Sequence, residues 1–185
     1  SMSEKEKMLS GQMYNAADEE LVKERERCKY LCHQYNLLSP ELVDERKNLM
    51  KQILGKTGDN FLIEQNFRCD YGYNIEIGEN FYVNHNCVML DCAKITFGDN
   101  VFIAPNCGFY TAGHPLDFET RNSGLEFAKP IKVGNNVWIG GGVTVLPNVT
   151  IGDNVVIGAG SVVTKSIPAN TVAVGNPCRV IKENK

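Results

Sequence analysis

Branched aliphatic residues recur at every sixth position through the second half of the chain. The clearest series is Val133, Ile139, Val145, Ile151, Ile157 and Val163. Three residues after each comes Asn136, Gly142, Asn148, Asn154, Gly160 or Ser166, and four residues after each comes Val137, Val143, Val149, Val155, Ser161 or Ile167. An earlier and less regular series, with a two-residue shift in its middle, is Ile77, Val83, Met89, Phe97, Ile103 and Phe109.

A period of six does not suit a helix or ordinary hairpins. At about 100° per residue, successive apolar positions would rotate by about 240°, so no single helix face would form. Hairpin turns usually recur at about 8 to 12 residues. A solenoid satisfies the pattern, because each hexad supplies a short strand and then a corner where Asn or Gly tolerates left-handed backbone angles. The pattern therefore predicts a mainly β solenoid whose stacked coils bury one apolar column.

The first part of the chain follows a helical period instead. Its apolar positions are Leu21, Cys28, Leu31, Cys32 and Tyr35, and the acidic run at 18–20 suits a helix start. A second helix is expected after Ser39 as N-cap and Pro40 at the first helical position, with Gly55 as its C-terminal cap. We expect a helical cap over 1–58 and a β-solenoid domain with a C-terminal tail over 59–185.

Composition narrows the class of protein. The 185 residues carry a formal net charge of -3, which argues against nucleic acid or an anionic membrane as a partner. No apolar run approaches the roughly 20 residues that span a bilayer, and the first residues lack the apolar core of a signal peptide, so we expect a cytoplasmic protein. The seven cysteines include no Cys-x-x-Cys pair, and we expect buried, reduced thiols.

A loop at about 110–130, "YTAGHPLDFETRNSGLEFAKP", interrupts the hexads. Long loops inside a compact array are usually functional or disordered, and the aromatic and aliphatic residues of this one suggest that it packs on something. His114 stands at its start, between a glycine and a proline. His33 belongs to the predicted first helix and His85 lies within a hexad, so His114 is the strongest candidate for chemistry.

Several of these stretches resemble a known family. "TAGHP" before an extended loop, "NNVWIGGGVTVLPNVTIGDNVVIGAGSVVTKSIP" and "VGNPCRVIK" are similar to the hexapeptide-repeat acyltransferases, in the maltose/galactoside O-acetyltransferase branch. "MLSGQMYNAADEELVKER" and "FRCDYGYNIEIG" resemble its maltose acetyltransferases in particular. The resemblance covers nearly the whole chain. It implies a left-handed parallel β-helix and a homotrimer with active sites between subunits.

The resemblance also implies a reaction. An acetyl group would pass from acetyl-CoA to a sugar hydroxyl, commonly the 6-hydroxyl of maltose, glucose or a related sugar, with no metal required. Galactosides or other small molecules remain alternative acceptors. His114 matches the family's catalytic histidine, and an imidazole is suited to act as a general base near neutral pH. Asn84 matches the asparagine that holds the acceptor hydroxyl near that base.

Further acceptor contacts are implied by the same resemblance. Asp70 and Asp91 fall at or near acceptor-binding positions, although each could instead cap its own turn. Glu126 is a candidate for the acceptor site and for orienting the imidazole. The family's acidic residue near the N-terminal tyrosine is displaced here, which leaves Asn15 or Asp18 as the possible substitutes.

The donor site is implied along the β-helix, in a groove between subunits. Its expected residues are Trp138, Gly141, Ala159, Thr164, Lys165, Arg179 and Lys182. Gly141 and Ala159 would let the pantetheine arm approach the backbone closely. The threonine and the three basic residues would lie near the phosphates. Trp138 should face outward and either flank the donor arm or fill a subunit interface.

Two alternatives belong to other functional classes. A γ-type carbonic anhydrase would need three converging histidines, and only His85 and His114 lie in the predicted β-helix. A non-catalytic hexapeptide scaffold would have no use for Asn84, His114 and the donor-side residues. Among acyltransferases, the serine and antibiotic-acetylating branches are closer alternatives, although their N-terminal regions differ from this one.

Overall fold

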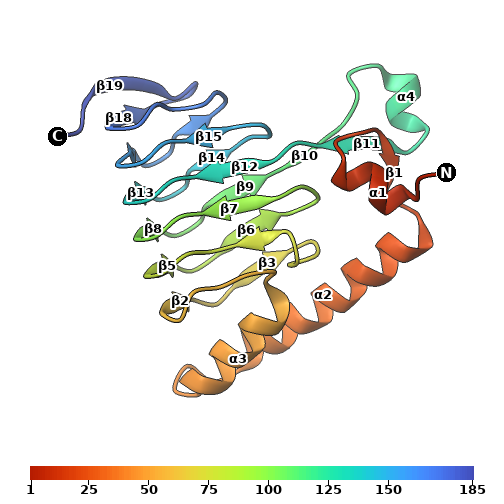
Figure 1. Cartoon of the computed structure of the whole chain (residues 1–185), viewed down its shortest axis with the longest axis horizontal. Helices are drawn as coiled ribbons and strands as arrows, with labels where there is room; N and C mark the ends of the chain where they lie inside the picture. The colour runs from red at the N-terminus through yellow and green to blue at the C-terminus, as the bar shows by residue number, and fades with distance from the viewer.

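The computed structural model describes residues 1–185 as a three-sided stack of coils, with two helices packed at its first coils and two short helices beside its middle (Figure 1). The helices are α1 (Glu4–Leu9), α2 (Glu19–Leu37), α3 (Val43–Ile53) and α4 (Phe118–Asn122). No helix is both long enough and apolar enough to cross a membrane.

The strands of the stack form three parallel sheets, one on each face, and the last strand joins one of these sheets in the antiparallel direction. A fourth, small sheet lies outside the stack. The seven-stranded face contains β2 (Phe61–Ile63), β5 (Phe81–Val83), β8 (Val101–Ile103), β13 (Val137–Ile139), β16 (Val156–Ile157), β18 (Thr171–Val174) and β19 (Arg179–Glu183). The five-stranded face contains β3 (Phe67–Cys69), β6 (Cys87–Leu90), β9 (Gly108–Tyr110), β14 (Thr144–Val145) and β17 (Val162–Val163). The four-stranded face contains β4 (Ile75–Glu76), β7 (Ile95–Phe97), β12 (Ile131–Val133) and β15 (Thr150–Ile151). The small antiparallel sheet joins β1 (Tyr14–Asn15), β11 (Leu125–Ala128) and β10 (Ala112–Gly113).

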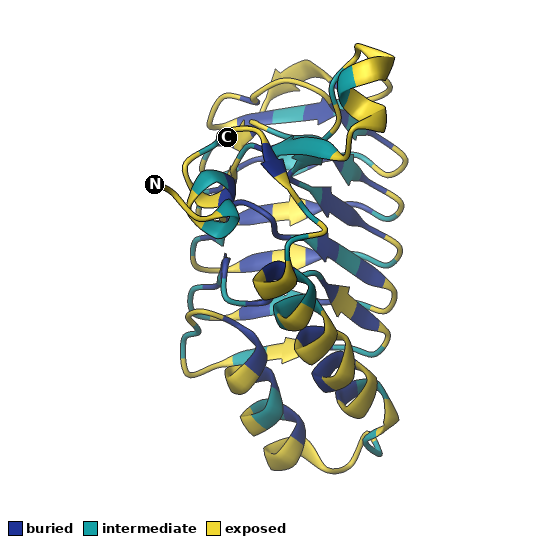
Figure 2. Ribbon diagram, turned by 90° about the vertical axis from the view of Figure 1, so that its right-hand side faces the viewer, coloured by how far each residue is buried: buried dark blue, intermediate teal, exposed yellow.

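The hexad pattern maps onto these faces as expected, and the predicted left-handed parallel β-helix is confirmed. All six branched aliphatic residues of the regular series that runs from Val133 to Val163 in steps of six are buried. The six residues that stand four positions after them are buried as well. Residues of successive coils stack in register, for example Val83 beside Ile103 and Ile103 beside Ile139. Figure 2 shows buried positions alternating with exposed ones along the strands. This alternation is expected because successive side chains point into and out of the stack, and the inward ones fill its interior.

Most of the predicted corner residues adopt the left-handed backbone. Positive φ angles occur at Asn136, Gly142, Asn148, Asn154 and Gly160. The exception is Ser166, which is not among the positive-φ residues and whose hydroxyl accepts the backbone N–H of Thr150 at 2.9 Å. Asparagine tolerates this conformation better than serine, and Asn170 adopts it instead at the next corner.

Asparagine side chains at the corners also bond from coil to coil. Along one edge, the Asn60 carboxamide donates to Asn80 at 2.6 Å, Asn80 to Asn100 at 2.9 Å, and Asn100 to Asn136 at 3.2 Å. A second ladder runs from Asn66 through Asn86 to Asn106, with distances of 3.3 and 3.1 Å. These ladders tie neighbouring coils together outside the apolar column.

The helical cap differs from the sequence-based expectation in its second helix. Asp18 caps α2 by accepting the N–H of Leu21 at 3.4 Å, in agreement with the predicted acidic start. The N-cap of α3, however, is Leu42 and not Ser39, whose hydroxyl bonds the Glu41 carboxylate instead. Gly55 does not cap the helix in a left-handed conformation. A Cβ there would lie 2.1 Å from the Tyr73 carbonyl oxygen, so close packing explains the glycine.

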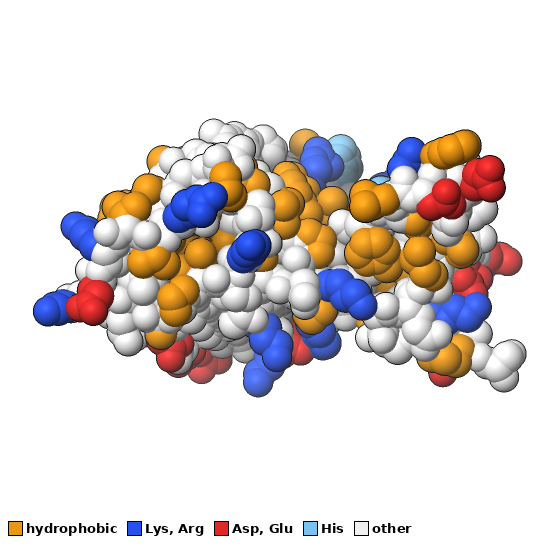
Figure 3. Space-filling model, turned by 90° about the horizontal axis from the view of Figure 1, so that it is seen from above, with side chains coloured by type: hydrophobic (Ala, Val, Ile, Leu, Met, Phe, Trp, Pro, Cys, Tyr) orange, Lys and Arg blue, Asp and Glu red, His pale blue; other side chains and the backbone are white.

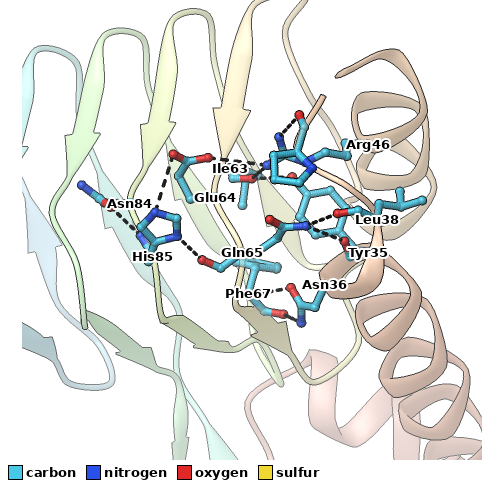
Figure 4. A network of polar contacts seen from close by, with 11 residues as sticks. Tyr35, Asn36, Leu38, Arg46, Ile63, Glu64, Gln65, Phe67, Asn84 and His85 are labelled. Atoms are coloured by element: carbon cyan, nitrogen blue, oxygen red, sulfur yellow. Dashed lines mark hydrogen bonds and ion pairs between the residues drawn. The ribbon is translucent and has the colours of Figure 1, made fainter. Parts of the chain in front are cut away.

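The cap shares one hydrophobic core with the first coils, which includes Tyr35, Met50, Ile63 and Phe67. A polar network reinforces this junction (Figure 4). Tyr35 donates its hydroxyl proton to the Ile63 carbonyl, and Arg46 donates to the same oxygen at 3.2 Å. Asn36 exchanges two hydrogen bonds of 3.0 Å with the backbone of Phe67. Helices α2 and α3 are therefore held on the first coils by both apolar and polar contacts.

Candidate active site

A pocket of about 290 Å³ lies where the interrupted repeat, the N-terminal segment and α2 meet. Its lining residues are Tyr14, Ala16, Arg25, Asp70, Tyr71, Leu90, Cys92, Ala112, His114 and Glu126. The structure thus brings together three residues singled out from the sequence: Asp70, His114 and Glu126. They come from two coil corners and from the loop at 110–130.

That loop is an ordered hairpin. β10 pairs antiparallel with β11, and Gly113 lies opposite Phe127. A Cβ on Gly113 would lie 2.7 Å from the Phe127 ring, so any other residue there would require the ring to shift. His114 follows directly and is exposed at the pocket. The pairing of β10 with β11 therefore places the imidazole at the point where the chain leaves the small sheet.

Glu126 is held by the N-terminal segment. β1 pairs with β11 so that Tyr14 lies opposite Glu126, and the tyrosine hydroxyl donates to the Glu126 carboxylate at 3.1 Å. Burial raises the pKa of Tyr14 above its usual range, so the hydroxyl remains a donor. The carboxylate is thus oriented by Tyr14.

Asp91 and Asp70 differ sharply in environment. Asp91 is fully buried, and its carboxylate accepts the backbone N–H groups of Asp70 at 3.0 Å, Tyr71 at 2.8 Å and Asn74 at 3.2 Å. Burial raises the pKa of Asp91 to about 6, although the backbone hydrogen bonds oppose the shift. The capping alternative therefore describes Asp91, which builds the turn that presents Asp70.

Asp70 is only partly buried and lines the pocket. Burial raises its pKa, while a hydrogen bond from the Cys92 thiol at 3.3 Å and the charge of Arg25 act in the opposite direction. Arg25 donates to the Tyr71 hydroxyl and to the Ala16 carbonyl, both at 2.6 Å. The pocket therefore combines two carboxylates, one guanidinium and one imidazole.

The sequence analysis did not identify Arg25 as a pocket residue, because it is one of many charged residues in α2. Its spacing could have indicated this role, since Arg25 follows Leu21 by four residues and precedes Cys28 by three, which places it on the buried face of the helix. Asn15 and Asp18, considered as substitutes for the displaced acidic residue, do not line the pocket. Asn15 accepts the N–H of Ala17 at 3.0 Å, and Asp18 caps α2.

Asn84 lies on a different edge of the solenoid. It follows β5 at the corner between the seven- and five-stranded faces, where its carboxamide oxygen accepts the His85 N–H at 2.7 Å (Figure 4). His114 lies at the corner between the five- and four-stranded faces. Within one chain, the structure does not bring Asn84 into the His114 pocket.

The expected donor residues are spread over the upper coils. Gly141 and Ala159 occupy the same edge as Asn84, whereas Thr164 and Lys165 lie on the His114 edge. Arg179 and Lys182 belong to β19 at the end of the stack, and both are exposed. Seen from above, Lys and Arg side chains are scattered among hydrophobic ones (Figure 3).

Trp138 faces outward, as expected, with 57% of its surface exposed. It lies beside Phe102 of the preceding coil, which is 54% exposed, and Phe102 lies beside Tyr82 and Tyr82 beside Leu62. These four residues form an outward apolar stripe along the seven-stranded face.

The fold and the pocket define the class of hexapeptide-repeat transferases with a helical cap. The family model described as the maltose acetyltransferase hexapeptide capping motif matches residues 7–58, and that of the bacterial transferase hexapeptide (six repeats) matches residues 130–165. A maltose O-acetyltransferase from Clostridium difficile 630 is 59% identical, with a TM-score of 0.99 and coverage of 100% of this chain and 98% of that one.

Two further similar proteins are also acetyltransferases. A galactoside acetyltransferase, solved in complex with coenzyme A, is 45% identical, with a TM-score of 0.96 and coverage of 100% of this chain and 92% of the other. A putative acetyltransferase of Saccharomyces cerevisiae is 54% identical over 179 residues, or 96% of this chain and 91% of that protein. The chain belongs to the maltose/galactoside O-acetyltransferase family of hexapeptide-repeat acetyltransferases.

Proposed function

We propose that this protein transfers the acetyl group of acetyl-CoA to a sugar hydroxyl, the 6-hydroxyl of maltose, glucose or a related sugar. The observation that carries the proposal is the pocket in which His114 lies together with Asp70, Glu126 and Arg25. Carboxylates accept, and a guanidinium donates, the paired hydrogen bonds that sugar hydroxyls make. Family membership supports acetyl transfer, and the galactoside relative was solved with coenzyme A.

In the proposed reaction, the imidazole of His114 accepts the proton of the acceptor hydroxyl as its oxygen attacks the thioester carbonyl. The carbon–sulfur bond then breaks, coenzyme A leaves as a thiolate, and the imidazolium returns the proton to sulfur. General-base catalysis of this kind contributes about 10² to 10⁴ in rate. No covalent enzyme intermediate is needed, so no cysteine acts as a nucleophile.

Asp70 and Glu126 bind acceptor hydroxyls in this proposal. Tyr14 holds the Glu126 carboxylate from one side, which leaves its second oxygen for the acceptor. Asp91 supports the Asp70 turn and makes no acceptor contact of its own, because its oxygens are already bonded to the backbone.

The active site is proposed to form between subunits of a homotrimer. Asn84 and His114 lie on different edges of one chain, so a site that uses both must combine the His114 edge of one copy with the Asn84 edge of its neighbour. The apolar stripe through Phe102 and Trp138 would be partly covered in such an assembly, as exposed apolar surface at interfaces commonly is.

The donor is proposed to lie along the Asn84 edge. Gly141 is informative because its own chain does not require a glycine there. Its φ is not positive, and an added Cβ would make only an ordinary contact, 3.5 Å from the Pro105 carbonyl oxygen. A pantetheine arm that passes close to Gly141 and Ala159 would explain why position 141 is a glycine. Trp138 would flank this arm, and Arg179 and Lys182 would lie near its phosphates. Thr164 and Lys165 would reach the phosphates from the His114 edge of the neighbouring copy.

The test is an acceptor screen that measures thiol release from acetyl-CoA. We expect turnover with maltose, glucose or galactosides, loss of turnover with the matching 6-deoxy sugars, and an acetyl group on O6 of the isolated product. Turnover with serine or an amine but with none of the sugars would overturn the proposal.

A further inference from the structure

Three thiols meet where α2 lies against β3, and the last of them directly precedes Asp70 of the candidate active site. Cys28 and Cys32 project from successive turns of α2, and Cys69 ends β3. The Cys69 sulfur lies 3.4 Å from that of Cys28 and 3.9 Å from that of Cys32, and all three sulfurs lie within 4.8 Å of one another. All three residues are buried and none forms a disulfide. We call this group the thiol cluster.

The spacing of the thiol cluster suits a metal ion. A zinc–thiolate bond is about 2.3 Å long, so two sulfurs bound to one tetrahedral ion lie about 3.8 Å apart. The separations of 3.4 and 3.9 Å lie on either side of this value. A cation at the centre could therefore bind all three sulfurs if the third pair, Cys28 and Cys32, whose sulfurs lie within 4.8 Å of each other, closes toward the same separation. Thiolate ligands select soft cations such as Cu⁺ and Zn²⁺.

The surroundings supply access and charge. A second pocket of about 280 Å³ is lined by Cys32 and Cys69, by the basic residues Lys29 and Arg68, and by Asp70, which also lines the His114 pocket. The pocket gives an ion a route from solvent and gives a small external ligand room to fill a fourth position. The two basic side chains would offset part of the negative charge that three thiolates bring to one ion, to which the Asp70 carboxylate adds.

The other four cysteines are arranged differently. Cys107 bonds the Gly140 carbonyl at 3.2 Å, Cys92 bonds the Asp70 carboxylate, and neither these two nor Cys87 and Cys178 belong to a group of metal-ligating side chains. Buried cysteines that serve only as small apolar side chains have no need to converge. The convergence of three sulfurs from a helix and a strand distinguishes the thiol cluster from ordinary core packing.

We propose that Cys28, Cys32 and Cys69 form a binding site for a soft, thiophilic cation of the Zn²⁺ and Cu⁺ class. Binding replaces the three thiol protons, which leave to solvent, with three metal–sulfur bonds. The ion ties the middle of α2 to the first coil and so stabilises the docked cap. The site is structural, and none of its three cysteines lines the His114 pocket.

The test uses the full-length, reduced protein titrated with Cd²⁺, whose thiolate complexes absorb in the ultraviolet. We expect one equivalent per chain by native mass spectrometry, a thiolate-to-metal absorption band and a raised melting temperature. Cys32→Ser should weaken Cd²⁺ binding by more than about 100-fold, because loss of a direct ligand costs more than loss of an outer partner. Cys87→Ser, which alters an equally buried cysteine outside the cluster, should leave the stoichiometry unchanged.

Two results would overturn the proposal. They are the absence of stoichiometric Cd²⁺ uptake and equal binding by Cys32→Ser and Cys87→Ser. Cys69→Ala repeats the comparison from the strand side. If that variant fails to fold by circular dichroism, Cys32→Ser alone decides.

Discussion

Tyr14 and Glu126, which are 112 residues apart in the sequence, lie opposite each other across β1 and β11 with the tyrosine hydroxyl 3.1 Å from the carboxylate. The N-terminal segment is therefore a wall of the pocket as well as part of the cap. Its contribution to acceptor binding can be measured separately from the chemistry at His114.

For Tyr14→Phe we expect the KM for the sugar to rise about tenfold while the KM for acetyl-CoA stays the same, because Glu126 loses the bond that orients it. Steady-state kinetics with each substrate varied in turn gives both constants. Tyr30→Phe, on the exposed side of α2, is the matched control. Equal rises in both KM values would argue against a role confined to the acceptor.

His114→Ala should lower turnover by about 10² to 10⁴ and leave the affinity for acetyl-CoA nearly intact, because the imidazole acts on the acceptor proton. Turnover comes from the thiol-release assay, and donor affinity comes from calorimetry. His33→Ala changes an exposed histidine on α2 and should behave as the unaltered protein. Retention of turnover within a factor of about three would remove His114 from the role of base.

The placement of Asn84 and His114 on different edges predicts complementation between variants. Asn84→Ala and His114→Ala should each be inactive as pure trimers. After mixed refolding in equal amounts, about a quarter of the intersubunit sites would carry both native residues, so about a quarter of the activity should return. Sedimentation should give three times 20.5 kDa. A mixture as inactive as its components would place each site within one chain.

Gly141→Ala should weaken acetyl-CoA binding about tenfold with little loss of stability, because the new methyl group would point into the donor groove and make only an ordinary contact with its own chain. Gly140→Ala is the contrasting variant. A Cβ there would lie 2.7 Å from the Ala159 backbone nitrogen, so the melting temperature should fall. Unchanged donor affinity in Gly141→Ala would move the donor away from this edge.

Asp91→Asn should destabilise the fold by about 1 to 3 kcal/mol, because the amide cannot accept all three backbone N–H groups. The loss should also depend on pH. Since the folded chain raises the pKa of Asp91 from 3.8 to about 6, its contribution to stability is present at low pH and is lost as pH rises through about 6.

The stability gap between the unaltered protein and Asp91→Asn should therefore be about 1 kcal/mol smaller at about pH 7.5 than at about pH 5. Urea unfolding at fixed protein concentration measures this gap. Asp59→Asn, an exposed carboxylate, serves as control. A gap that stays constant between these two pH values would mean that Asp91 is ionised throughout this range.

The solenoid could be predicted from the sequence because its period is local. Val133 and Ile139 belong to a series with six-residue spacing that can be recognised in the sequence, and both are buried in the structure. The prediction of Ser39 as an N-cap was wrong, although a capping residue followed by proline is a common helix start. The Ser39 hydroxyl bonds Glu41 instead, and the helix starts after Leu42.

The site was only partly predictable because its geometry is set by contacts distant in sequence. The meeting of Cys69 with α2, or of Arg25 with Tyr71, has no local signature. Whether Asp91 binds an acceptor or caps a turn could not be decided by residue type, because both uses need the same carboxylate. Only the three backbone N–H groups around it distinguish them.

The asparagine ladders along the corners have a consequence for how this molecule can change in size. A carboxamide inside a ladder donates one hydrogen bond and accepts another, as Asn80 does between Asn60 and Asn100. The Asn100–Asn136 bond spans 36 residues where the Asn80–Asn100 bond spans 20, because the loop at 110–130 projects from another corner. Extra residues can therefore be accommodated as projections from a corner without a ladder, while the height of the stack should change only by complete coils.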